Sequence, residues 1–349
     1  MLFANHINLQ LLYGFLLFFL SCNDSPRTFN IVGSTMGTTY SVKINSSPNH
    51  IDIDVFKSDI DSILLSINKK MSTWDSTSEI SKFNGWESTE PFTISKSFIE
   101  VVKTAQEISE RTNGYFDITV FDLMSFWGFG PNPMKELPDS NKIKNILKHT
   151  GHRNLIVDGA SLIKLKTTTK LDLNAIAKGY AVDRLFKYVS DKGNPNIFVE
   201  IGGEIRCVGK NQKMNQWSIG IEDPPNEQLQ DPKYALILML GKKSVATSGN
   251  YRNFVNLEGQ ILGHTINPKS GFPVNSNILS VSVLANSCMV ADAWATALMA
   301  LDHDRGLRLV KSNPQISVIW IMENEFKNRI IFCSSKNLEL RKAIYPILY

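Results

Sequence analysis

The stretch VADAWATALMAL, residues 290–301, carries one acid and one hydroxyl in an otherwise apolar run. Asp292 and Thr296 stand four positions apart, so on a helix they share one face. This pair can bind a hard cation, and Mg²⁺ is often held by one or two protein oxygens plus substrate phosphates. The alternative is structural: Asp292 accepts a backbone hydrogen bond and Thr296 bonds back to its own helix. The two residues alone leave both interpretations open.

The stretch KLDLNAIAKGYAVDRL, residues 170–185, places a carboxylate and a lysine at the start of another predicted helix. We expect a strand to end at Asp172 and the helix to begin near Ala175, with Lys178 in its first turn. A lysine there opposes the helix dipole unless an anion lies between them, and a phosphate is the natural candidate. In the alternative, Asp172 resembles an N-cap residue and Lys178 is a solvated surface charge.

Two loops in the second half of the chain carry further polar groups. A predicted strand leads into Thr247, Ser248 and Gly249, and Arg252 follows closely. His264 stands at the end of a predicted strand, before a turn rich in proline and glycine. A lone histidine is more often structural than catalytic, although a strand end beside hydroxyl-rich loops is a common place for function.

The familiar nucleotide and hydrolase signatures are absent from the sequence. It contains no G-x-x-x-x-G-K-[ST], no G-x-G-x-x-G between a strand and a helix, no G-x-S-x-G and no H-E-x-x-H. We interpret Gly202-Gly203, between two predicted strands, as a hairpin turn, because glycine supplies the positive φ that such turns need. Cys207, Cys288 and Cys333 are widely spaced and odd in number, which predicts neither a disulfide framework nor a zinc site.

The elements that must position these groups follow from hydrophobic periodicity. We predict helices over 54–70, 95–114, 140–151 and 175–191, one around VADAW, and a last one at the C-terminus. We predict a strand pair or bent strand over 28–44, and strands at 154–158, 162–166, 171–173, 196–201, 204–209, 217–221, 234–240, 244–247, 261–266, 279–285, 316–322 and 329–333. Without a regular βαβ alternation, this mixture favours an α+β fold with mixed, largely antiparallel sheets and packed helices, in one domain over 22–349.

The N-terminus has the pattern of an export signal. Residues 11–20 form an apolar run that is too short to span a bilayer but suits the core of a signal peptide. The run ends in FLSC, which resembles the lipobox of bacterial lipoproteins, so we expect residues 1–21 to be a signal peptide and Cys22 to be lipidated. An ordinary signal peptide or an uncleaved anchor is the alternative. The net charge of the chain is +4, and the sequence contains no Lys/Arg run that would follow a nucleic-acid backbone. We therefore expect no nucleic-acid partner.

Taken in order, nine segments of the chain resemble the ApbE family of flavin transferases. They lie between residues 34 and 301: STMGTTYSVKI, MSTWDSTSEISKFN, GYFDITV, LMSFWGFG, LDLNAIAKGYAVD, VEIGGEIRCVG, SVATSGNYRNF, HTINPKSGFPV and VADAWATALMAL. The resemblance implies an ApbE-like, T-fold-like architecture and an enzyme that binds FAD and Mg²⁺. Such enzymes transfer FMN to a threonine of a target protein and release AMP. The implied targets are membrane redox subunits of the sodium-translocating NADH:quinone reductase or Rnf type, reached from a lipid anchor on the periplasmic side.

The resemblance also assigns roles to residues. It implies a flavin end of the site formed by Met36, Trp74, Tyr115, Phe116 and Asp117, and further FAD contacts from Asp172, Lys178, Ser248, Arg252 and Ile266. It implies a metal held by the Ala175 carbonyl and by the side chains of Asp292 and Thr296. One departure is Asn174, where many members have a small residue, next to the expected metal carbonyl.

The chemistry of an in-line phosphoryl transfer suits these residue types, since charge must be neutralised and the nucleophile positioned. Lys178 or Arg252 would add positive charge at the phosphates. The resemblance places His264 near the scissile phosphate, where it would accept the threonine proton, a role that Asp292 could share. Two alternatives use the same residues: an FAD pyrophosphatase that yields FMN and AMP, and a lipoprotein that binds flavin without catalysis.

Overall fold

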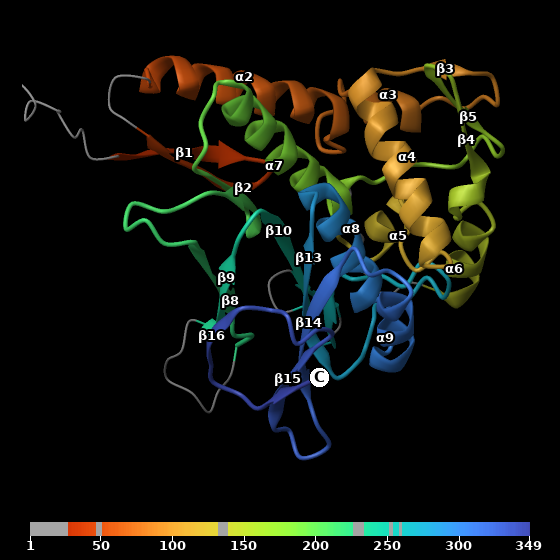
Figure 1. Cartoon of the computed structure of the whole chain (residues 1–349). Helices are drawn as coiled ribbons and strands as arrows, with labels where there is room; N and C mark the ends of the chain where they lie inside the picture. The colour runs from red at the N-terminus through yellow and green to blue at the C-terminus, as the bar shows by residue number, and fades with distance from the viewer. Residues whose placement is uncertain (1–26, 47–50, 132–138, 226–233, 251–253, 258–259) are drawn as a thin grey trace, which may run out of the picture.

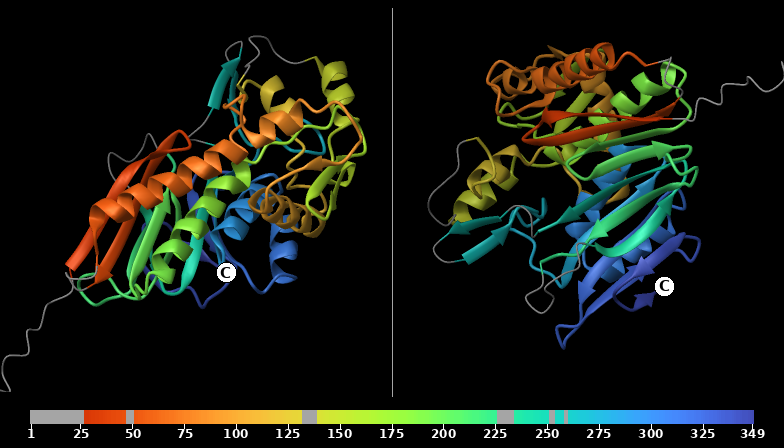
Figure 2. Two further views of the ribbon diagram at one scale, coloured as in Figure 1. Left: turned by 90° about the horizontal axis from the view of Figure 1, so that it is seen from above. Right: turned by 90° about the vertical axis from the view of Figure 1, so that its left-hand side faces the viewer.

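The structure is a computed structural model, and it describes the chain except for residues 1–26, 47–50, 132–138, 226–233, 251–253 and 258–259. Its centre is a nine-stranded sheet in which every neighbouring pair is antiparallel except the last, β15 with β17. The strands, in spatial order, are β1 (Arg27–Thr35), β2 (Thr38–Ser46), β6 (Ile197–Ile201), β7 (Glu204–Val208), β10 (Lys243–Gly249), β13 (Ile278–Ala285), β14 (Ser317–Glu323), β15 (Arg329–Cys333) and β17 (Ile347–Leu348). Figure 2 shows them stacked from red β1 to the blue C-terminal strands. The α+β prediction is confirmed.

Helices cover one face of this sheet, and a smaller sheet covers the other (Figure 1). The helical layer contains α2 (Ile53–Met71), α4 (Lys96–Arg111), α7 (Asn174–Asp191) and α8 (Cys288–Met299). The smaller sheet is formed by β8 (Trp217–Glu222), β9 (Tyr234–Leu240) and β16 (Leu340–Ala343). Side-chain alternation separates the two cores: Val318 and Trp320 of β14 join the helical core, whereas Ile319 and Ile321 join the other.

A third region lies beside the helical layer (Figure 1). It contains α3 (Glu79–Asn84), α5 (Phe121–Phe126), α6 (Ser140–Leu147), the short 3-10 helix His152–Asn154, and a sheet of β3 (Phe92–Thr93), β5 (Ser161–Lys164) and β4 (Leu155–Asp158). The remaining elements of the described residues are the hairpin of β11 (Phe254–Leu257) and β12 (Gln260–Gly263), and helix α9 (His303–Lys311).

The predicted strand at 171–173 is wrong. Leu171 and Leu173 are buried, as their types suggested, but the segment pairs with no strand. Instead, the Asn84 side chain takes the place of a neighbouring strand: its Nδ2 donates to the Leu171 carbonyl at 2.8 Å, and its Oδ1 accepts from the Leu171 amide at 2.7 Å. A side-chain amide satisfies this buried backbone, so no ladder is needed.

The predicted C-terminal helix is also wrong. After β15 the chain forms β16 against β9 and then β17 against β15. Pro346 cannot donate in a helix interior, and Leu340, Ala343 and Ile347 pack against the core between the two sheets. The helix of this part of the chain, α9, comes earlier, before β14. The strand predicted at 261–266 ends at Gly263, so His264 follows the strand instead of ending it.

Two hairpin turns bear on the site. Gly202 and Gly203 join β6 to β7 with φ values of 61° and 102°, which confirms the predicted turn. Met36 and Gly37 join β1 to β2 with φ values of 50° and 72°. The proposed signal peptide and Cys22 lie outside the described residues. Within the described residues, every helix is too short or too polar to cross a bilayer.

Candidate active site

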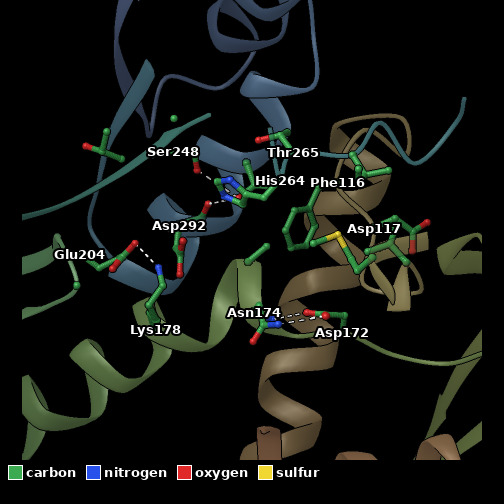
Figure 3. A pocket seen from close by; sticks show the side chains of 18 of the residues that line it. Phe116, Asp117, Asp172, Asn174, Lys178, Glu204, Ser248, His264, Thr265 and Asp292 are labelled. Carbon is green, nitrogen blue, oxygen red and sulfur yellow. Dashed lines mark hydrogen bonds and ion pairs between the residues drawn. The ribbon is translucent and has the colours of Figure 1, made fainter. Parts of the chain in front are cut away.

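A cavity of about 370 Å³ gathers twelve of the fourteen residues selected from the sequence (Figure 3). It lies where the first turn of α7, the end of β10, the segment after β12 and helix α8 meet the Met36–Gly37 turn. The twelve are Met36, Tyr115, Phe116, Asp117, Asp172, Ala175, Lys178, Ser248, His264, Ile266, Asp292 and Thr296. Segments up to 260 positions apart in the sequence therefore form one site.

Two of the selected residues are not in this cavity. Trp74 lies beside an adjoining cavity of about 1020 Å³ and is 65% exposed. Met36, Lys178 and His264 line both cavities, so Trp74 stands at the extension of the site and not in its centre. Arg252 lies outside the described residues, and its expected contact stays a prediction.

The carboxylate of Asp292 is buried between α7 and α8. Its Oδ2 accepts a hydrogen bond from the Gly179 amide at 2.9 Å. Only glycine fits at 179, because a Cβ there would lie 2.4 Å from the Cys288 carbonyl oxygen. Burial raises the pKa of Asp292, while Lys178 and the Gly179 amide act in the opposite direction.

Thr296 lies one turn further along α8. Its Oγ1 donates to the Asp292 carbonyl at 3.3 Å and lies 3.4 Å from Ser248 Oγ. Both contacts of the structural interpretation are therefore present: the backbone bond to Asp292 and the back-bond of Thr296. They leave Asp292 Oδ1 without a hydrogen bond among the described residues, so structure and ligation are compatible.

The oxygens at this point fit a magnesium ion. The Gly179 amide, which in a regular helix would donate to the Ala175 carbonyl, also donates to Asp292, so Ala175 lies one turn before the contact between α7 and α8. Ala175, Asp292 and Thr296 all line the cavity, and their carbonyl, carboxylate and hydroxyl oxygens are the hard donors that Mg²⁺ prefers. In the described part of the chain no three His, Cys, Asp or Glu side chains cluster for a metal. Such a site would need ligand phosphates to complete it.

Lys178 is not a solvated surface charge, and that alternative is wrong. Its Nζ lies 2.5 Å from Glu204 Oε1, and Figure 3 shows the two side chains directed at each other across the cavity wall. Glu204 is 3% exposed, and its Oε2 has no hydrogen-bond partner among the described residues. Burial raises the pKa of Glu204 to about 7, against the attraction of Lys178. For Lys178 the carboxylates of Glu204 and Asp292 outweigh burial and raise its pKa.

Sequence reasoning missed Glu204. It directly follows Gly202-Gly203, which from the sequence alone is interpreted only as a hairpin turn. The available signal was an acid at an inward-facing position of a strand, where an apolar residue is the usual occupant. Its partner Lys178 is 26 positions away, so only the fold brings the pair together.

Asp172 lies one residue before the N-cap of α7, which is Leu173, and its carboxylate accepts from the first residue of the helix, so the N-cap suggestion is one residue out. Its Oδ1 accepts from the Asn174 amide at 2.7 Å and its Oδ2 from the Asn174 side chain at 3.1 Å, just ahead of α7. Burial raises its pKa to about 6, despite these two hydrogen bonds. Asn174, the departure from the family pattern, therefore orients Asp172 in this chain.

Asp117 also lines the cavity, and its carboxylate is hydrogen-bonded on both oxygens. Its Oδ1 accepts from the amide and hydroxyl of Thr119 at 2.8 and 2.6 Å, and its Oδ2 accepts from the His152 amide at 2.6 Å. Both oxygens are thus used to hold the loop that presents Tyr115 and Phe116 to the cavity. Met36 lines the same cavity and has a left-handed backbone conformation, which costs a non-glycine residue about 1 kcal/mol and is typical of functional sites.

The fold and the cavity together define a class of protein. It is an α+β protein whose cavity suits an anionic ligand and a cation, and the cavity lies where two helices meet rather than at a P-loop. A sequence model of the ApbE family matches residues 36–320, and the chain belongs to that family. The resemblance seen in the sequence is confirmed.

Similar proteins agree over nearly the whole chain. The chain is 37% identical to a FAD:protein FMN transferase of Vibrio cholerae, over 89% of this chain and 92% of that protein. The solved structure of the flavin transferase ApbE from Vibrio cholerae superposes with a TM-score of 0.81 at 36% identity, covering 89% of this chain and 98% of that one. The apo flavinyl transferase ApbE of Pseudomonas stutzeri gives a TM-score of 0.78 at 32% identity, covering 86% and 92%.

Proposed function

We propose that this chain is a FAD:protein FMN transferase. It belongs to the ApbE family, and the relatives that it matches over most of its length are described by that activity. One observation carries the proposal: Lys178, His264, Asp292 and Thr296 line a single cavity. A binding protein without catalysis would not need this combination of cation, base and oxygen ligands.

In the proposed reaction a threonine Oγ of the target protein forms a bond to the FMN phosphorus. The bond from this phosphorus to the bridging oxygen breaks, and AMP leaves. His264, which lines both cavities, would accept the threonine proton at neutral pH. Asp292 is a further candidate for this proton if its Oδ1 is not a ligand.

Magnesium is part of the proposal. The Ala175 carbonyl, Asp292 and Thr296 would hold it, and it would supply Lewis-acid stabilisation of the pyrophosphate. Lys178 stands at the same wall, already charged by its pairing with Glu204, and would contact the phosphates. We expect the flavin to lie toward Met36 and Tyr115, in the direction of Trp74.

The sequence supports a place and a partner for this activity. We propose that the chain is exported, anchored to the cell membrane through a lipid on Cys22, and faces the periplasm. The acceptors would be threonine-bearing subunits of membrane redox complexes of the sodium-translocating NADH:quinone reductase or Rnf type. The export pattern before Cys22 and the family membership are the support for this proposal.

The proposal is tested with the mature chain, FAD, Mg²⁺ and a threonine-bearing target domain, followed by intact mass spectrometry. A mass gain equal to FMN on the target, with AMP released, is the expected result. AMP and free FMN without labelled target would identify an FAD pyrophosphatase. FAD binding without turnover would identify a binding protein.

Asp292→Ala gives the sharpest variant of this test. The substitution removes the one carboxylate of the proposed metal site, so Mg²⁺-dependent transfer should be lost while the protein stays folded by circular dichroism. Full activity of this variant with Mg²⁺ would contradict the metal assignment.

A further inference from the structure

Helix α7 carries an acid whose partners all lie outside its own helix. Asp183 accepts hydrogen bonds from Ser287 Oγ at 2.6 Å and from the amides of Cys288 and Met289 at 3.0 Å each. These amides are the first of α8 and have no carbonyl partner within that helix. Asp183 therefore caps the N-terminus of the neighbouring helix, where a negative charge is also favoured by the dipole.

A third element joins the same carboxylate. Arg206 of β7 lies with Nη1 2.5 Å from Asp183 Oδ1, and its guanidinium stands 4.3 Å above the ring of Phe186. The Asp183 side chain is only 14% exposed. One carboxylate thus ties α7, α8 and the central sheet together, with its charge compensated by arginine and amides.

Asp183 stands at one end of a row of contacts between the two helices. Going back one turn along α7 leads from Asp183 to Gly179, and going forward one turn along α8 leads from Cys288 to Asp292. Gly179 and Asp292 form the next contact, the 2.9 Å hydrogen bond. One further turn along each helix leads to Ala175 and Thr296, which both line the cavity. The antiparallel faces therefore meet at steps of four residues, from the Asp183 cap to the proposed metal oxygens.

We propose that Asp183 is a positioning residue, which fixes the register of α7 against α8 and so sets the geometry of the proposed metal site. A slip of one residue moves a helix by about 1.5 Å, whereas metal–ligand distances must hold within about 0.2 Å. The site combines a carbonyl of α7 with two side chains of α8, so it depends on this register. The inference rests on the proposed function through the metal.

The test compares Asp183→Ala and Asp183→Asn with Asp223→Ala. Asp223 is the matched control, because it also pairs with an arginine, Arg329 at 3.0 Å, and with a hydroxyl, Tyr345 at 2.7 Å, but does not line the cavity. Two quantities are measured without acceptor: the Mg²⁺ concentration that gives half of the melting-temperature shift in the presence of FAD, and FAD binding in EDTA by flavin fluorescence.

We expect Asp183→Ala to raise the half-saturating Mg²⁺ concentration at least about tenfold, and to change FAD binding in EDTA by less than about twofold. Asp183→Asn keeps one acceptor oxygen and should give a smaller rise; it carries the test if the alanine variant does not fold. Asp223→Ala should lower the melting temperature without changing the Mg²⁺ dependence.

An unchanged Mg²⁺ dependence in the folded Asp183 variants, or an equal change in Asp223→Ala, would overturn the inference. A wild-type protein that melts identically with and without Mg²⁺ would overturn it together with the metal site. If Mg²⁺ shifts the melting temperature but FMN transfer is absent, only the proposed function fails.

Discussion

Lys178 and Lys164 stand in two regions of this molecule that treat a lysine in opposite ways. Lys178, in the first turns of α7 at the cavity, lies 2.5 Å from the buried Glu204 carboxylate, which raises its pKa. Lys164, at the end of β5, is fully buried and lies 3.4 Å from the carbonyl oxygens of Asn84 and Thr167. Its ammonium also stands 4.7 Å above the ring of Phe83. In the described residues no carboxylate forms an ion pair with it, and burial lowers its pKa to about 8.

The difference separates a lysine held for a ligand from a lysine held for the fold. The acid beside Lys178 keeps the ammonium charged and half-buried at a cavity, where an anion can take over or share the contact. Lys164 instead satisfies buried carbonyls, one of them on the Asn84 that holds the segment before Asp172. In this molecule the lysine with a charged partner at an open cavity is therefore the candidate for ligand binding, and the lysine that bonds to buried carbonyls is not. The next three experiments test this contrast.

Lys178→Met should have the largest effect. If Lys178 contacts the FAD phosphates, its loss should lower kcat/KM for FMN transfer about 100-fold, the usual range for a lost charged hydrogen bond. Steady-state kinetics with FAD as the varied substrate measure it. Lys164→Met is the control and should retain the wild-type kcat/KM. Equal losses in the two variants would remove the functional distinction between the lysines.

Glu204→Gln should have the next largest effect, on stability. Removing the carboxylate charge leaves the Lys178 ammonium in the cavity wall without its ion-pair partner. Loss of one partner of a fully buried pair costs about 3–5 kcal/mol; because the Lys178 side chain is 30% exposed, we expect about 2 kcal/mol in the free energy of unfolding.

Urea unfolding at pH 7.5 measures this change, and the double variant Lys178→Met, Glu204→Gln is the control. It should recover part of the loss, because no unpaired charge remains. A Glu204→Gln protein as stable as the wild type would show that the pair is not a stabilising contact.

The smallest effect concerns the pH dependence contributed by Lys164. The pKa of this lysine is about 8 in the folded protein and 10.5 in its ordinary state, so between these values the unfolded chain binds more protons. The contribution of Lys164 to the free energy of unfolding therefore rises with pH between about 8 and 10.5, and this contribution is constant below pH 8.

Lys164→Met should remove this rise. We measure the unfolding free energies of both proteins by urea unfolding from pH 7.5 to 10. The value of the variant minus that of the wild type should fall as the pH increases, because only the wild type gains stability from this group. A difference that is independent of pH would contradict the lowered pKa.

Most of the fold was predictable from local pattern. Helices at 54–70 and 175–191 and the strands of the central sheet other than β17 follow from the spacing of apolar residues, and they are found as α2, α7 and β1 to β15 of that sheet. The errors at 171–173 and at the C-terminus arise where a tertiary partner overrides the local pattern. The Asn84 side chain makes the hydrogen bonds that a neighbouring strand would make with Leu171. The last residues of the chain pair with β9 and β15 as strands.

The sequence by itself determined which residue types are present and in what order: the acid and hydroxyl of α8, the lysine of α7, the histidine after β12, and the family to which they belong. These properties depend on local spacing and on motif order, which a chain carries without folding. The tertiary structure alone decided which groups meet. Glu204 reaches Lys178, Gly179 reaches Asp292, and Asp183 caps α8, across separations of 26 to 113 positions. Such pairings depend on the close packing of α7, α8 and the central sheet, and no local pattern encodes them.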